Sequence, residues 1–185
     1  MMLRKQAGFG VERNVTKELL VVVFSVILTS GCYQISQYSG DGRLVDNGYS
    51  SAIDRYVLNL GQVDFTRRGR TTYRMKNLPG VDFVVGIEIA TGPESRIVVE
   101  ERLVNPVLSL ELSQGGAVLF SKKSALSTWT WSVPRAVMPN IVYGEETYFT
   151  ADSNAEYALT LSVLEPDLSQ SKYTAHLVVK SGGWK

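Results

Sequence analysis

The sequence predicts an all-β fold, an antiparallel two-sheet sandwich of the jelly-roll or immunoglobulin-like kind. Apolar and polar residues alternate with a period of two in several segments beyond residue 53, which is typical of half-buried antiparallel strands. Clusters rich in glycine, proline, asparagine and serine separate these segments at short intervals. About nine or ten such strands fit two packed sheets better than one open sheet, and no clear helical pattern follows residue 32.

Four segments show the clearest alternation. Their expected core-facing residues are Phe83, Val85, Ile87 and Ile89 in VDFVVGIEIA, Leu108, Leu110 and Leu112 in PVLSLELSQGG, Tyr157, Leu159, Leu161 and Val163 in EYALTLSVLEP, and Ala175, Leu177 and Val179 in TAHLVVK. Shorter candidate strands are RYVLNL, TTYRMKNL, RIVVEERL, AVLFSK, STWTWSV and ETYFTA. The last two long segments resemble the closing hairpin of many β-sandwich and jelly-roll modules, a likeness that does not specify a family.

Composition and charge limit the classes of function. With 185 residues and 44% hydrophobic content, the chain can bury one good core. The formal net charge is +1, so no overall field attracts the chain to nucleic acid. A single cysteine excludes a disulfide framework within the chain.

The first 31 residues are typical of an export signal. A positively charged leading segment precedes Leu19–Leu28, in which every residue but Ser25 is apolar. This run has the length of a signal-peptide core and is too short to span a membrane as a stable helix. Three small residues, Thr-Ser-Gly, then lead directly to Cys32. The alternative is a buried free cysteine at the end of an ordinary core helix.

The motif LTSGC, ending at Cys32, resembles the lipobox of bacterial lipoproteins, although Thr29 stands where an aliphatic residue is usual. The resemblance implies cleavage after residue 31, a diacylglycerol on the Cys32 thiol, and a third acyl chain (palmitate) on its new amino group. Two or more acyl chains anchor a protein stably. Tyr33, in place of the aspartate that marks inner-membrane retention, implies the periplasmic face of the outer membrane. Cleavage leaves 15 of 19 basic and 16 of 18 acidic side chains.

The segment 32–52 is expected to be a flexible tether that carries the lipidated cysteine. It is polar and rich in Gly, Ser, Asp and Asn, with no sustained period. Its motif DGRLVDNG lacks the bidentate glutamate and ligand spacing of a calcium loop, so we expect no metal there. The folded sandwich domain is expected to occupy residues 53–185.

The sequence holds no recognisable catalytic motif. His176 is the only histidine, too few for a multi-histidine zinc site, and we expect a surface or edge position for it. No Gly-x-Ser-x-Gly turn, phosphate-binding loop or dinucleotide fingerprint is present. We therefore expect a protein that is not an enzyme and has no cofactor besides the covalent lipid. Loose candidates for a converging carboxylate pair are Asp82, Glu88, Glu111, Glu145 and Asp152.

A basic cluster, RRGR, contains Arg67, Arg68 and Arg70, and it lies close in sequence to Phe65 and Tyr73. Gly69 suggests a hairpin tip, and a solvated turn is the favoured interpretation. A site for an acidic partner or a lipid headgroup is the alternative. Nucleic-acid binding is not expected, because the exported domain is near neutral.

Aromatic residues mark the strongest candidate for recognition. Trp129 and Trp131 are two apart and would share one face of a strand. Flat rings can stack on sugars or anchor a protein, but large rings also fill cores, and that interpretation is favoured. The irregular stretch Pro134–Gly144 and the residues around it are the candidate binding loop. The possible binding residues are Trp129, Trp131, Arg135, Tyr143 and Tyr148.

Two classes of function remain. The favoured one is a non-enzymatic module that binds a protein partner in the bacterial envelope. The alternative is a glycan-binding module, or less favourably a hydrolase, that acts on cell-wall or surface polysaccharide. Fold alone does not separate them, since sandwiches carry many unrelated functions.

Overall fold

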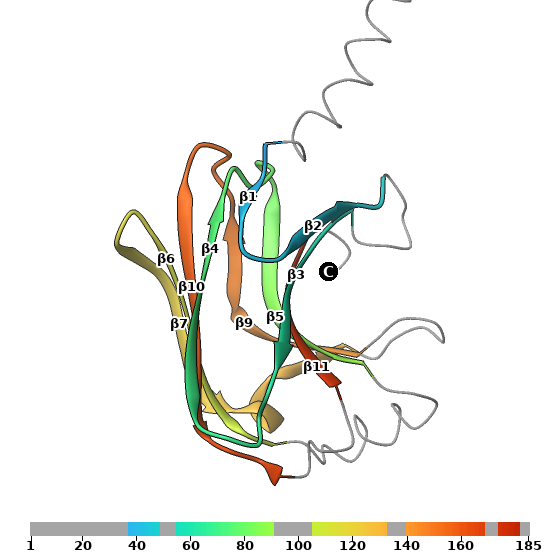
Figure 1. Ribbon diagram of the computed structural model, residues 1–185, viewed down its shortest axis with the longest axis vertical. Helices are drawn as coiled ribbons and strands as arrows, with labels where there is room; N and C mark the ends of the chain where they lie inside the picture. Colours follow the sequence, from blue (N-terminus) through green and yellow to red (C-terminus); the bar gives the residue numbers. More distant parts are fainter. Residues whose placement is uncertain (1–36, 49–54, 91–104, 133–139, 169–173, 182–185) are drawn as a thin grey trace, which may run out of the picture.

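A computed structural model describes residues 37–48, 55–90, 105–132, 140–168 and 174–181. Within these ranges, two antiparallel sheets pack face to face as a β-sandwich, which confirms the predicted fold class (Figure 1). Sheet A contains, in spatial order, β1 (Ser39–Gly40), β4 (Gly69–Lys76), β10 (Glu156–Glu165), β6 (Val107–Gln114) and β7 (Ala117–Ala125). Sheet B contains β2 (Arg43–Asp46), β3 (Tyr56–Val63), β11 (Thr174–Ser181), β5 (Asp82–Ala90), β9 (Asn140–Thr150) and β8 (Thr130–Ser132).

The core lies between the sheets and is built from the residues that the alternation predicted. All fourteen expected core-facing side chains on β5, β6, β10 and β11 are buried, and none is more than 6% exposed. Their neighbours along each strand point away from this core, because successive side chains of a strand face opposite sides. Burial of each large aliphatic or aromatic side chain contributes about 1.5–3 kcal/mol of hydrophobic stabilisation.

Two expectations for the aromatic region are wrong. STWTWSV is a strand only at Thr130–Ser132, because the chain first makes a 3-10 turn, η1 (Leu126–Thr128). The fully buried Leu126 anchors this turn, and its N–H donates to Pro106 O at 2.9 Å. The stretch Pro134–Gly144 is not irregular throughout, since β9 already begins at Asn140. The candidate strand RIVVEERL lies outside the described residues.

The segment expected to be a flexible tether is structured in part. Its strands β1 and β2 pair with β4 of sheet A and β3 of sheet B, so the chain crosses from one sheet to the other. Leu44 of β2 is buried in the core. The crossing depends on Gly40 and Gly42, whose φ values are 135° and 82°. Strands of two and four residues are too short to show a readable period, which explains the wrong expectation.

At the opposite edge of the sandwich, a large bulge in β9 links the two sheets. Val84 of β5 pairs with Tyr148 and Gly86 pairs with Tyr143, so four β9 residues lie opposite Val85. The fully buried Thr147 holds this bulge: its Oγ1 lies 2.8 Å from Val85 O and accepts the Gly144 N–H at 3.2 Å. Such a bulge bends the strand and redirects its side chains.

Replacing Thr147 with valine is expected to lower the free energy of unfolding by about 1–3 kcal/mol, because the buried groups that its hydroxyl meets lose their partner. Urea unfolding of the full-length protein measures this as a lower midpoint with an unchanged slope. Thr72→Val is the matched control, since Thr72 is exposed and its hydroxyl lies 2.9 Å from the Thr160 hydroxyl on the outer face of sheet A. Equal losses in the two variants would contradict the role assigned to Thr147.

Candidate functional site

Trp129 lies in the core and offers no exposed ring. It is 2% exposed, its Nε1–H donates to Ser124 Oγ at 2.9 Å, and Lys122 Nζ lies 5.5 Å from its ring centroid. This is the core position that the sequence favoured. Trp129 does not share a strand with Trp131, because β8 begins one residue after Trp129.

Three predicted site residues cannot be placed as side chains. The backbone of Trp131 belongs to β8, but its side chain lies outside the described residues. Arg135 and the lipidation residue Cys32 also lie outside the described ranges. These residues therefore stay predictions from the sequence.

The structure brings Tyr143 and Tyr148 together. They flank the β9 bulge, and their rings meet edge-on with centroids 5.8 Å apart and an interplanar angle of 90°. Tyr148 is 38% exposed, and partial burial, with a smaller effect from the hydrogen bond that its hydroxyl donates to Tyr143, raises its pKa to about 12. Because the two rings are perpendicular, they do not form one flat stacking surface.

The structure places two of the candidate carboxylates and the histidine on the outer faces of the sheets. Lys180 Nζ and Glu88 Oε2 form an ion pair at 2.7 Å, and both residues lie on the outer face of sheet B. Glu111 faces outward from sheet A, so these two carboxylates do not converge. His176 is not on an edge strand: it is half-buried on the interior strand β11, paired with Glu88 and Gln62. In the described ranges, no group of three or more metal-ligating side chains is found.

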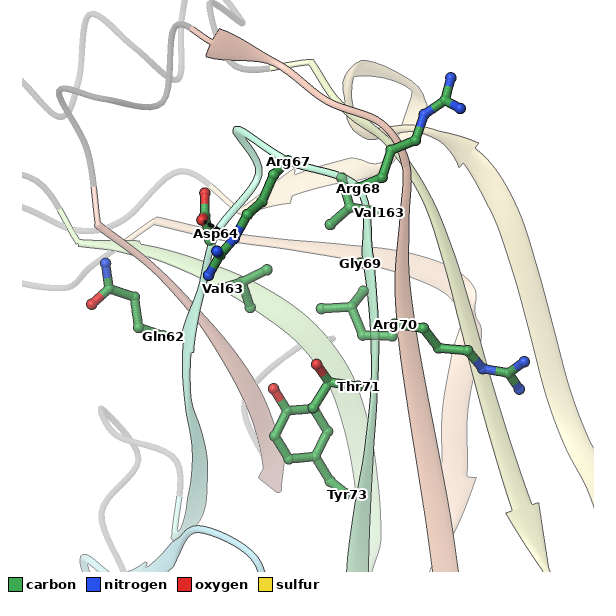
Figure 2. Close-up of a pocket in the computed structure, with 11 residues that line it drawn as sticks. Gln62, Val63, Asp64, Arg67, Arg68, Gly69, Arg70, Thr71, Tyr73 and Val163 are labelled. Atoms are coloured by element: carbon green, nitrogen blue, oxygen red, sulfur yellow. Dashed lines mark ion pairs between the residues drawn. The ribbon is translucent and has the colours of Figure 1, made fainter.

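An opening of the sandwich lies between β3 and β4, which belong to different sheets (Figure 2). A pocket of about 380 Å³ enters the space between the sheets here. Thr71 and Tyr73 alternate inward on β4, yet Thr71 is exposed and Tyr73 only half-buried, so the core face of β4 is accessible at this end. The residues between β3 and β4 connect the two sheets, so Gly69 does not form the predicted hairpin tip.

The pocket has an apolar floor and polar walls. Val63 of β3 and the β10 residues Leu161 and Val163 form the floor, and all three are buried. Thr71 and Tyr73 project into the space between the strands in Figure 2. Burial, with a smaller effect from the negative charge of Asp41, raises the pKa of the Tyr73 hydroxyl.

The crossing from β1 to β2 closes one half of this edge and leaves the other half open (Figure 1). β1 pairs with β4 only at Met75 and Lys76. Asp41 then covers Arg74: the Asp41 N–H donates to Arg74 O at 2.8 Å, and Asp41 Oδ2 accepts the Arg74 N–H at 2.7 Å. Beyond this point, residues 69–73 have β10 on one side and no neighbouring strand among the described residues on the other.

The exposed edge of β4 carries main-chain groups that have no strand partner in the part of the chain that the structure describes. Main-chain N–H and C=O groups point to alternate sides along an antiparallel strand. Since those of Arg74 point to the Asp41 side, those of Thr72 and Arg70 point to the same open edge. Across the opening, the edge of β3 is less available for pairing with a further strand, because the Gly61 N–H already donates to Asn59 Oδ1 at 2.8 Å.

Three arginines lie at this end of β4. Arg67 pairs with Asp64 at 2.8 Å, and hydrogen bonds from Thr66, with a smaller effect from Arg67, lower the pKa of the Asp64 carboxyl. Arg68 and Arg70 have no acidic partner among the described residues. Their guanidinium groups point away from the pocket in Figure 2. Two unpaired cations therefore lie beside the unpaired main chain of β4.

The other edge of sheet A is protected. A register shift between Leu112 and Ser113 places a bulge in β6–β7 pairing, and β7 carries Lys122 and Lys123. Lys122 Nζ binds Glu146 Oε1 of the β9 bulge at 2.5 Å, which brings sheet B over this edge. Bulges and edge lysines are common means of preventing further strand pairing. The open half of β4 lacks such a bulge.

Fold and site together define a β-sandwich with an accessible strand edge and an adjoining pocket. No protein-family model, curated protein or solved structure matches the chain. Within the described ranges, the structure contains no helix of the length and apolarity required to cross a membrane.

Sequence reasoning found the arginines but missed the open edge. The run RRGR and the neighbouring Tyr73 mark the right region, and an acidic partner was the alternative interpretation. The edge of β4 is open because of the strand order in sheet A and because β1 ends at Gly40. Both depend on contacts between residues far apart in the sequence. The available signal was the charged run RRGR directly before the expected strand TTYRMKNL, since charged residues are frequent on edge strands.

Proposed function

We propose that the protein is a lipid-anchored, non-enzymatic binding module of the bacterial envelope that takes an extended segment of a partner protein. The observation that carries this proposal is the open main-chain edge of β4 beside the pocket. An extended peptide can add to such an edge as a further strand: main-chain hydrogen bonds supply affinity, and pockets for alternate side chains supply specificity.

The proposed anchor is Cys32, with the protein at the periplasmic face of the outer membrane. Support comes from the apolar run Leu19–Leu28, the lipobox-like LTSGC and the absence of an aspartate after the cysteine. A lipid anchor suits a module of near-neutral charge, because charge alone would not hold it to an anionic surface. The structured crossing β1–β2 begins only a few residues after Cys32, so the domain would stay close to the membrane.

Capture of a partner tests the proposed function. The full-length protein, purified in detergent, is immobilised and exposed to envelope extract, and the retained protein is quantified. Thr72→Pro is expected to reduce retention about tenfold, because it removes a free N–H and blocks the edge. The substitution is expected to preserve the pairing of β4 with β10, because the Thr72 N–H points away from β10. Proline is tolerated in such edge positions.

Thr72→Val is the matched control, because it removes the same hydroxyl but keeps the N–H. Equal retention by the proline and valine variants would contradict the edge as the binding site. Purified peptidoglycan and lipopolysaccharide are presented in parallel to test the glycan-binding alternative. That alternative has one favourable feature, the exposed ring of Tyr148. Retention of glycan that Tyr148→Ala abolishes would replace the proposed protein partner by a sugar.

A further inference from the structure

We infer that the occupant of the β4 edge is an acidic extended segment, aligned antiparallel to β4, with apolar side chains that enter the pocket. This inference rests on the proposed function and names the chemistry of its partner. It follows from three properties of the same edge: the direction set by β1, the apolar floor of the pocket, and the unpaired arginines.

The direction of the segment follows from the existing strand. β1 is antiparallel to β4 and ends beside Met75, where Asp41 turns the chain toward sheet B. A segment that continues the line of β1 lies opposite residues 73 to 70, in the mouth of the pocket. There it meets the N–H and C=O groups of Thr72 and Arg70, which lie on the same side of β4 as the Arg74 groups that Asp41 binds through its N–H and its side-chain carboxylate.

The pocket selects apolar residues at alternate positions. Side chains opposite Thr71 and Tyr73 face the interior of the sandwich, because paired residues in an antiparallel ladder point to the same side. They would meet the buried floor of Val63, Leu161 and Val163. A volume of about 380 Å³ is at the low end of the roughly 300–1,000 Å³ of small-molecule sites, which suits a few aliphatic side chains.

The outer face selects acidic residues at the positions between. The residue opposite Arg70 points outward beside an unpaired guanidinium, and Arg68 lies near the same end of β4. Opposite charges directly across two strands attract, and like charges repel. The same arginines therefore disfavour a second copy of this edge as the occupant. A membrane headgroup is also less suitable, because it would leave the main-chain groups of Thr72 unpaired.

The test uses two synthetic peptides and the full-length protein in detergent. One fluorescent peptide alternates valine with glutamate over nine residues, and the other alternates valine with lysine. Fluorescence anisotropy is expected to show about tenfold or more tighter binding of the glutamate peptide. Arg70→Gln is expected to weaken that binding about three- to fivefold, while Lys123→Gln on the far edge of sheet A leaves it within about twofold.

Thr72→Pro should remove binding, Thr72→Val should keep it, and bound peptide should slow hydrogen exchange at the amides of Arg70 and Thr72. Urea midpoints show whether each variant folds, and Arg70→Gln tests the charge without touching the backbone. Equal affinity for both peptides, or no effect of Arg70→Gln, would overturn the acidic assignment. Two further results would also overturn it. One is a dimer that Thr72→Pro abolishes, and the other is binding of anionic vesicles that depends on Arg70 and is unaffected by Thr72→Pro.

This result is separate from the capture experiment. If envelope protein is retained through Thr72 but the glutamate peptide does not bind, the acidic segment is wrong and the binding module stands. If retention does not depend on Thr72 either, the proposed function fails with it.

Discussion

Replacement of Cys32 by serine is expected to transfer the protein from the membrane pellet to the soluble fraction, or to leave its signal segment uncleaved. Without the thiol no diacylglycerol can attach, and each buried CH₂ of an acyl chain contributes about 0.8 kcal/mol to membrane binding. The loss should be close to complete, because the remaining basic and acidic side chains nearly balance and provide no second attachment.

The measurement is fractionation of cells that express the full-length chain, together with incorporation of a labelled fatty acid. Ser36→Ala is the matched control, since it removes a hydroxyl from the same polar segment and leaves the cysteine intact. A Cys32→Ser protein that is cleaved normally and still sediments with membranes would contradict the lipid anchor. In that case the domain would have to reach the membrane through a protein partner.

Much of the sandwich could be predicted because its interior strands are long and alternate regularly. In β6, for example, Leu108, Leu110 and Leu112 face the core while Ser109 and Glu111 face outward, a period that no helix would produce. The same local pattern determines which residues are buried, so the core followed directly from it. Local patterns do not, however, determine which strand lies at an edge.

The parts that could not be predicted depend on pairing across the sandwich. His176 lies on an interior strand because β3 and β5 flank β11, which nothing in TAHLVVK indicates. The 3-10 turn η1 before β8 is another such feature, since STWTWSV has the pattern of one continuous strand. The open edge of β4 exists because β1 ends after two residues, and a strand of that length has no signature in the sequence.

The chain crossing at Gly40 and Gly42 determines where the sandwich is open. This crossing fastens β4 to β3 at one end and limits the open edge to the other. The crossing backbone approaches β4 and β3 so closely that neither Gly40 nor Gly42 has room for a Cβ. A Cβ on Gly40 would lie 2.2 Å from Arg74 O, and one on Gly42 would lie 2.4 Å from Asn59 O.

Gly40→Ala is therefore expected to lower the free energy of unfolding by about 3 kcal/mol or more, since the variant suffers both a backbone clash and an unfavourable φ. Gly48→Ala separates the two effects, because Gly48 also has a positive φ (74°) but a Cβ there would meet nothing within 4 Å. Its expected loss is about 1 kcal/mol. Urea unfolding of both full-length variants gives the comparison.

Gly40→Ala also tests whether the crossing controls the open edge of β4. If Gly40→Ala detaches β1 while the sandwich stays folded, amide hydrogen exchange should quicken at Arg74, which loses the cover of Asp41, and should be unchanged at Leu159 in the interior strand β10. The newly free groups would lengthen the open edge of β4 toward Met75, so a longer acidic peptide should bind more tightly than the nine-residue one. Equal destabilisation by the Gly40 and Gly48 substitutions, with no change at Arg74, would mean that the crossing does not control how much of β4 is open.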